Sequence, residues 1–163
     1  MKYRIFVSRD KRGMGFPDAH LLIKRAARAA LKAEGVDVPA AMDVLLTDDS
    51  GINGINLEYR NVDKPTDVLS FPQNEFAPGG FDADIAEKNP ETGELFLGDM
   101  VLSLERTLAQ GEEYGHGEKR EIMYLTVHSV LHLLGYDHVD EAEMKKQMRA
   151  REKEIMKLLD KNE

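Results

Sequence analysis

The pattern of hydrophobic and polar positions along the chain predicts strands that alternate with helices. Residues 2–8 alternate apolar and polar side chains as a half-buried strand does, whereas residues 18–34 place apolar side chains at helical spacing. By the same tests we expect further strands at 41–47, 67–71 and 95–103, and further helices at 52–61, 104–113, 121–134 and 141–159. This order predicts an α+β domain in which about five helices cover a small mixed β-sheet of about four strands.

Capping residues indicate where these helices begin and end. Asp18 is expected to open the first helix, and Gly35 to end it, because glycine adopts the left-handed conformation past a helix end without steric cost. Ser50 is expected to cap the second helix. Asp140, followed three residues later by Glu143, resembles a capping pair that starts the last helix.

The helix predicted at 121–134 is the stretch around which we expect the domain to be organised. Its apolar side chains spread all round the helix, which predicts that it is buried. His128 and His132 lie four residues apart and therefore share one face, one turn apart. Gly135 then lets the chain turn back, so that His138 can meet the other two histidines.

Three imidazoles in a His-x3-His-x5-His pattern are typical of a catalytic zinc site with one open coordination position. We therefore expect one Zn2+ per chain, held by His128, His132 and His138 at the end of the buried central helix. Two other interpretations stay open. The histidines can be satisfied core residues, or the zinc can be purely structural, although structural sites prefer four ligands and usually cysteine, which this chain lacks.

Length and composition are those of a single domain over residues 1–163, with 42% hydrophobic and 32% charged residues. Residues 73–94 combine prolines and glycines with many acidic side chains and predict a long acidic loop, either a lid or disordered. The chain shows neither a signal peptide nor about 18 consecutive apolar residues, so we expect a cytoplasmic protein without membrane contacts. The absence of cysteine fits that compartment.

The formal net charge of −8 argues against non-specific binding to polyanions, and no DNA partner is expected. Any contact with nucleic acid must therefore be local. Basic residues do gather at 24–32 in the first helix and at 145–151 in the last. Such clusters are more often solvated helix faces than binding sites.

Three separated segments of the chain together carry a family resemblance. They are INLEYRNVDKPTDVLSFP at 55–72, LGD at 97–99 and HSVLHLLGYDH at 128–138. In this order they resemble the YbeY family, bacterial endoribonucleases called rRNA maturation factors. The resemblance implies a zinc-dependent, single-strand-specific endoribonuclease that acts in 3′-end maturation of 16S rRNA and in ribosome quality control. The implied partners are rRNA, the small ribosomal subunit and ribosomal or ribosome-associated proteins.

The resemblance also implies that the zinc is held by the three histidines of the last segment and that Arg60 is functional. The chain departs from the family pattern at two places. Ser129 replaces the glycine that usually follows the first histidine, and the loop at 73–94 is longer than usual.

The chemistry can also be reasoned from residue types. Three neutral imidazoles leave the zinc its full charge, so a bound water would have a pKa of about 7 and could attack a phosphodiester. Arg60 offers a planar, permanently charged fork to the developing negative charge, but a surface salt bridge explains it equally well. Asp99 and Asp137 are candidates to orient the ligating histidines, with turn or cap roles as the alternative. Glu121 is expected to give the site structural support.

Two other functions compete with the ribonuclease. The histidine spacing is also that of metzincin zinc peptidases, which need a glutamate general base at the position occupied here by Ser129. That hypothesis requires another carboxylate, such as one from the acidic loop. The third function is a non-enzymatic ribosome-assembly factor in which the zinc only stabilises the fold.

Overall fold

The computed structural model describes residues 3–136 and 142–161. Its strands are β1 (Tyr3–Arg9), β2 (Ala40–Thr47), β3 (Val68–Pro72) and β4 (Leu95–Ser103), in the sheet order β1-β2-β4-β3. The first three in this order run parallel, and β3 pairs antiparallel with β4 at the edge. The prediction of a mixed, four-stranded sheet is therefore confirmed.

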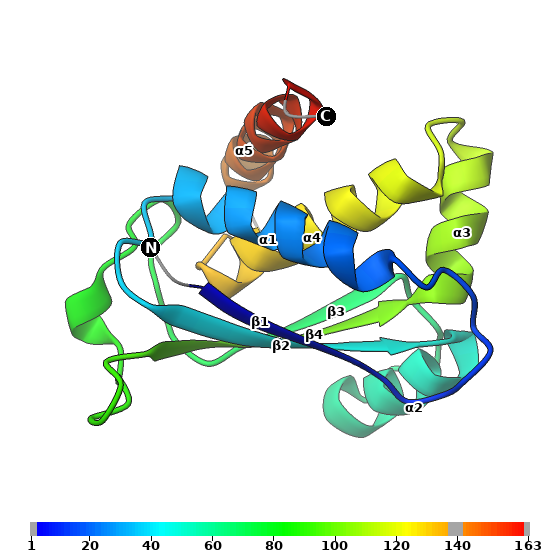
Figure 1. Ribbon diagram of the computed structural model, residues 1–163, viewed down its shortest axis with the longest axis horizontal. Coiled ribbons are helices and arrows are strands. Elements are labelled where there is room, and N and C mark those ends of the chain that lie inside the picture. The colour runs from blue at the N-terminus through cyan, green and yellow to red at the C-terminus, as the bar shows by residue number, and fades with distance from the viewer. Residues whose placement is uncertain (1–2, 137–141, 162–163) are drawn as a thin grey trace.

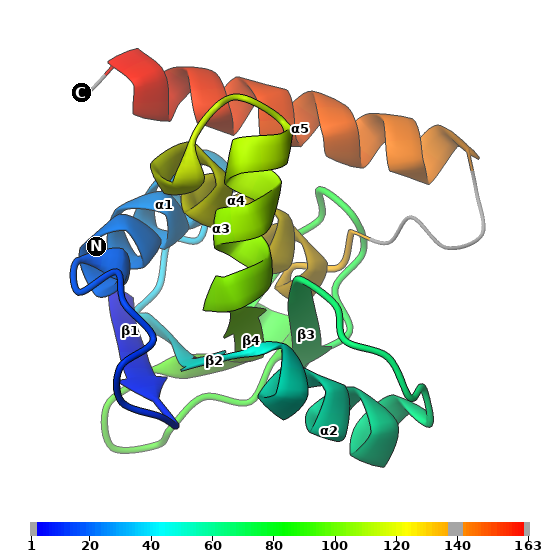
Figure 2. The same cartoon turned by 90° about the vertical axis from the view of Figure 1, so that its right-hand side faces the viewer.

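Helices lie on both faces of this sheet (Figure 1). They are α1 (Ala19–Ala33), α2 (Asp49–Arg60), α3 (Leu104–Glu113), α4 (Glu118–Leu133) and α5 (Ala142–Lys161), with a short 3-10 turn at Ala83–Ile85. One face carries α1 and α4, and α5 packs on these two helices away from the sheet. The opposite face carries α2, as Figure 2 shows from the side. The predicted α+β class is confirmed.

The main hydrophobic core lies between the sheet and the layer formed by α1 and α4. Ile23 of α1, Met100 of β4 and Val130 of α4 are fully buried in it. A smaller cluster beneath α2 contains Ile52 and Val101. The predicted burial of the central helix is confirmed, because apolar residues on several sides of α4 are buried.

The helix ends agree only partly with the expected caps. Gly35 has the positive φ of 76° expected after α1, whereas Asp18 precedes that helix without a side-chain capping bond. The expected cap at Ser50 is wrong, because Asp48 accepts the capping hydrogen bond from the Gly51 amide at 2.9 Å. The expected capping pair at the start of α5 includes Asp140, which lies outside the described residues.

Residues 73–94 connect the antiparallel strands β3 and β4 and are anchored to the body of the domain. Phe76 is 6% exposed and packs into the main core. The Asn74 amide donates to the Phe96 carbonyl at 2.9 Å. Helix α4 ends at Leu133, and two residues later Gly135 has a φ of 102° at a point where a Cβ would clash with the Phe76 carbonyl oxygen. Only glycine fits there.

None of the helices in the described ranges is long and apolar enough to cross a membrane.

Candidate functional site

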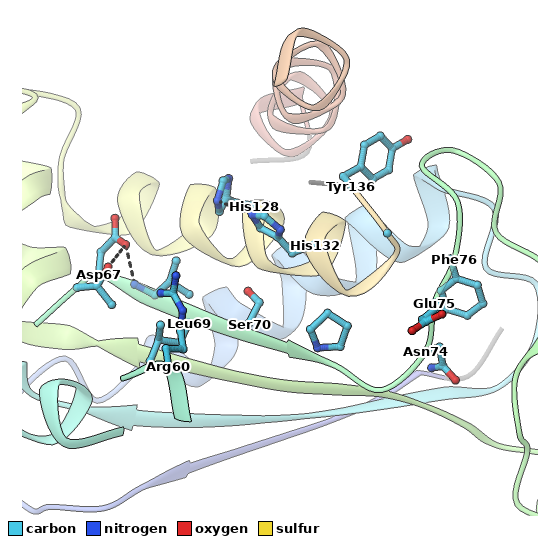
Figure 3. Close-up of a pocket in the computed structure, with 14 residues that line it drawn as sticks. Arg60, Asp67, Leu69, Ser70, Asn74, Glu75, Phe76, His128, His132 and Tyr136 are labelled. Atoms are coloured by element: carbon cyan, nitrogen blue, oxygen red, sulfur yellow. Dashed lines mark hydrogen bonds between the residues drawn. The ribbon is translucent and has the colours of Figure 1, made fainter. Parts of the chain in front are cut away.

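A cavity of about 580 Å³ opens along the edge strand β3, beside the C-terminal half of α4. His128 and His132 enter it from α4, Arg60 from the end of α2, and Glu75 from the acidic loop (Figure 3). Because β3 is an edge strand, this side of the sheet is open to the surface. The fold thus brings together Arg60 and His128, which lie 68 positions apart in the sequence.

The two histidines are arranged as a pair of metal ligands. The His128 Nε2 atom lies 3.2 Å from the His132 Nε2 atom, and the rings meet edge to face with centroids 4.7 Å apart. Two nitrogens on one tetrahedral zinc, each about 2.0–2.1 Å from the metal, are separated by about 3.3–3.4 Å. The spacing of the ring nitrogens therefore fits a shared zinc ion.

Glu152 of α5 orients the first of these histidines. Its side chain is almost fully buried, and its Oε2 atom lies 2.6 Å from His128 Nδ1. Its other oxygen accepts a hydrogen bond from the Tyr124 hydroxyl at 3.1 Å. A carboxylate that accepts the Nδ1 proton leaves the Nε2 lone pair available to a metal. Burial, and then the Glu152 carboxylate, raise the pKa of Tyr124, so its hydroxyl stays a donor.

Glu152 was not among the predicted site residues, although the sequence held a signal for it. It lies at helical spacing within the apolar stripe of α5 formed by Met148, Ile155 and Leu159. A charged residue within such a stripe becomes buried and needs a partner. The apolar members of the stripe pack into the main core, and its one acidic member makes it part of the site.

Ser129 is fully buried immediately after the first histidine. Its hydroxyl lies 2.7 Å from the hydroxyl of Ser70 on β3, within hydrogen-bond distance. This contact ties α4 to the edge strand directly beneath the histidines. Serine therefore acts as a packing and hydrogen-bonding residue at the position where a metzincin carries its general base.

Arg60 is exposed at the last position of α2 and lines the cavity together with the histidines (Figure 3). Its Nη1 atom donates a long, 3.4 Å hydrogen bond to Asn56. Among the described residues, no carboxylate forms an ion pair with Arg60 within 4 Å. The geometry therefore favours a role in the cavity over the surface salt bridge that the sequence equally allowed.

Glu121 is buried on α4, and its partners lie on the side of α3. Gln110 donates to Glu121 at 2.8 Å, and the His116 Nε2 atom lies 2.9 Å from its other oxygen. The same Gln110 amide lies 3.2 Å from Asp67, which lines the cavity. Among the described residues, Glu121 is thus linked to the cavity through Gln110 and Asp67, and its expected structural support of the site stays a prediction.

The structure does not bring Asp99 to the histidines. Alternation along β4 turns Met100 and Leu102 toward α4, whereas Val101 faces α2. Asp99 shares the face of Val101 and lines a separate hollow with Asp43. Burial, and then the Asp43 carboxylate, raise its pKa. Asp99 therefore cannot orient His128 or His132, and the prediction is wrong for these two histidines.

The remaining predicted residues of the site, His138 and Asp137, lie outside the described residues. Within 3–136 and 142–161, no three histidine or acidic side chains are placed to hold a metal ion together. The described part of the site thus contains two of the three predicted ligands, and metal binding by all three stays a prediction.

Comparison with known proteins decides which family carries this arrangement. The family model described as Endoribonuclease YbeY matches residues 7–160. The chain belongs to the endoribonuclease YbeY family. Endoribonucleases are hydrolases of RNA phosphodiester bonds, so the predicted family and enzyme class are confirmed.

Curated relatives extend over most of the chain. The Endoribonuclease YbeY of Clostridium botulinum strain Eklund 17B is 45% identical and covers 85% of this chain and 86% of its own length. That of strain Hall is 48% identical, with coverage of 83% and 84%. A solution structure of TM1509 from Thermotoga maritima is similar in fold, with a TM-score of 0.53 and 24% identity over 98% of this chain and 93% of that one.

Proposed function

We propose that this member of the YbeY family is a zinc-dependent, single-strand-specific endoribonuclease of the cytoplasm. We further propose that it acts in 3′-end maturation of 16S rRNA and in ribosome quality control, with the small ribosomal subunit and ribosomal or ribosome-associated proteins as partners. One observation above all supports the catalytic part: two histidine Nε2 atoms 3.2 Å apart in a cavity that also contains an arginine. The ribosomal part rests on the resemblance of residues 55–72 and 128–138 to the family.

His128 and His132 would hold the zinc together with His138. When bound, the metal lowers the pKa of a coordinated water toward about 7 and so provides a nucleophile at neutral pH. Glu152 holds His128 in the tautomer that presents Nε2 to the cavity. The hydrogen bond between Ser129 and Ser70 fixes the histidine helix to the strand that forms the cavity floor.

Arg60 is the cation available to the substrate phosphate. It stays charged at any working pH, and its planar fork can contact two phosphate oxygens at once. Charge that develops on those oxygens during cleavage is stabilised most by a donor already in place. A cavity of about 580 Å³ accommodates a nucleotide but not a base-paired duplex, which supports the preference for single strands.

A zinc peptidase would have to draw its general base from the acidic loop. Glu75 is the loop carboxylate that lines the cavity, so it is the residue on which that hypothesis depends (Figure 3). Ser129 cannot serve, because its hydroxyl has no proton affinity at neutral pH and is committed to Ser70. Family membership favours RNA as the substrate.

The test compares metal-quantified protein on three substrates: a single-stranded RNA, the same RNA in a duplex, and an unfolded protein, each with and without chelator. We expect chelator-sensitive cleavage of the single strand only. A small subunit that carries 3′-extended 16S rRNA then tests the maturation step. Peptide cleavage without RNA cleavage would replace the proposal with a Glu75-dependent peptidase. Loss of the fold on zinc removal, with no cleavage beforehand, would replace it with an assembly factor.

Arg60→Ala should lower the rate of RNA cleavage by about 10² or more, because it removes the cation that meets the developing charge. Zinc content and melting temperature should hardly change, since the side chain is exposed. Arg60→Lys is the matched control and should recover only part of the rate, because it restores the charge without the planar fork. A wild-type rate in Arg60→Ala would remove Arg60 from the mechanism.

A further inference from the structure

A second hollow of about 460 Å³ lies between α4 and α5, next to the histidine cavity. Its floor contains Tyr124, Glu152 and the buried Met156. Its rim is basic and consists of Arg120, Arg149, Lys153 and Lys157. We call this hollow the α4–α5 groove. In a chain of net charge −8, such a concentration of cations is unusual.

The cations of α5 form a regular row along the helix. Lys145, Arg149, Lys153 and Lys157 follow one another at intervals of four residues, and all are exposed. An interval of four residues corresponds to about 6 Å along the helix axis and keeps the side chains on neighbouring sectors of one face. Like charges at this spacing repel one another and destabilise a helix. The row therefore needs an explanation other than helix stability.

Within the described part of the chain, no ion pair neutralises this row. Arg120, on the α4 side, is the rim cation with an acidic partner, because its Nη1 atom lies 2.6 Å from Asp160. Glu152 also lies in the groove, but its two oxygens are engaged by His128 and Tyr124. The positive charge of the row is thus available to a ligand.

The groove and the histidine cavity share no lining residue, but they are linked through His128. Tyr124 and Glu152 line the groove, and both contact His128, which lines the cavity. Figures 1 and 2 show α5 crossing over α4 on the side away from the sheet. A strand whose phosphate lies beside His128 can therefore continue over Tyr124 and along the row on α5.

We propose that the α4–α5 groove binds the phosphate backbone of the RNA strand that flanks the cleavage position. This inference rests on the proposed endoribonuclease function and adds a substrate-binding surface to it. Arg149 and Lys153 are the central phosphate contacts, because they are adjacent in the row and neither forms an ion pair among the described residues. Arg60 then holds the strand on one side of the histidines, and the groove holds it on the other. This is the local contact that lets an acidic protein bind a polyanion.

The test uses a matched pair of double variants. R149Q/K153Q removes one arginine and one lysine, four residues apart, from the groove. R28Q/K32Q removes the same residue types at the same spacing from α1, where both side chains are also exposed. The affinity of the zinc-loaded proteins for a fluorescent single-stranded RNA of about 12 nucleotides is measured over a range of salt concentrations, and cleavage is followed in parallel.

Each phosphate contact to a single strand contributes about 0.7 to the slope of log affinity against log salt concentration. R149Q/K153Q should therefore reduce the magnitude of that slope by about 1.4 and weaken binding about tenfold, whereas R28Q/K32Q should keep the wild-type slope. Cleavage of the 12-nucleotide strand by R149Q/K153Q should be impaired through KM, and cleavage of a dinucleotide should be unchanged.

Equal slopes for the two double variants, or slopes equal to that of the wild type, would overturn the groove as an RNA site. The row would then be a solvated helix face or the contact of an acidic protein. A slope reduced only in R149Q/K153Q, with no zinc-dependent cleavage by the wild type, would support the groove and overturn the proposed enzyme. The two proposals can therefore fail separately.

Discussion

Two histidine–glutamate pairs each include one residue of the central helix α4. Of these, the pair of His128 and Glu152 is the one whose histidine lines the cavity. His116 is 2.9 Å from Glu121 near the start of α4, and His128 is 2.6 Å from Glu152 toward its end. In both pairs the carboxylate is nearly fully buried and has a second donor, Gln110 in the first and Tyr124 in the second.

The pairs differ in what surrounds the second nitrogen of the histidine. The His128 Nε2 atom lies 3.2 Å from another imidazole nitrogen and borders a cavity. His116 instead packs near the ring of Tyr114, with centroids 5.9 Å apart, and the hollow that it lines between α3 and α4 contains no second histidine among the described residues. A buried carboxylate–histidine pair is thus not by itself a functional site. What distinguishes the His128–Glu152 pair is the His132 Nε2 atom, which lies beside the Nε2 atom of His128.

The largest expected effect is a loss of bound zinc that distinguishes His132 from His116. His132→Ala should lose most of the bound zinc, because it removes one of the two converging Nε2 atoms. His116→Ala should keep the wild-type metal content. Metal analysis after dialysis against a small excess of zinc measures both. Stoichiometric zinc in His132→Ala would mean that the ion is held elsewhere.

A smaller effect separates the two carboxylates. Glu152→Gln should weaken zinc binding by about 10- to 100-fold, since a carboxylate that accepts the second ring proton strengthens its histidine as a ligand. Glu121→Gln should leave zinc affinity unchanged and lower the free energy of unfolding by about 1–3 kcal/mol, because the buried amide keeps only one acceptor oxygen for its two partners, Gln110 and His116. Chelator competition and urea denaturation distinguish the two. Equal zinc affinities in both variants would contradict the orienting role of Glu152.

The smallest expected effect concerns Tyr124 and Gln110, which donate the second hydrogen bond to the two buried carboxylates. Tyr124→Phe leaves Glu152 with one fewer hydrogen bond and should weaken zinc binding by a factor of about three, with a stability loss of about 1 kcal/mol. Gln110→Ala, which removes the corresponding donor to Glu121, should not change zinc affinity. The same chelator competition measures both variants. A larger loss of zinc in Gln110→Ala would show that the two networks are coupled.

The fold was predictable because the local patterns agreed with the tertiary structure. Alternation in residues 2–8 and the all-round apolar helix at 121–134 each gave an element at nearly the right place. The pair His128 and His132 was predictable for the same reason, since a separation of four residues on one helix fixes their proximity. The cap of α2 was missed because Asp48 and Ser50 are both good capping residues and the sequence alone could not choose between them.

Contacts between separate elements were harder to predict. Asp99 was assigned to the wrong side because strand β4 is apolar on both faces, so its sequence does not reveal which face meets α4. Glu152 was missed because its partner lies 24 residues away, on another helix. Its place in an apolar stripe indicated that Glu152 is buried. The packing of α5 on α4 was needed to identify His128 as its partner.

The position of Glu152 in the chain has a consequence for how the protein is made. Translation produces Arg60 and the histidine helix first, and the carboxylate that orients His128 follows within α5, after every other described element of the site. A nascent chain still held in the ribosome therefore lacks the partner that sets its first metal ligand. On the proposed function, the site of an enzyme that cuts ribosomal RNA is assembled only once α5 has left the particle that synthesises it.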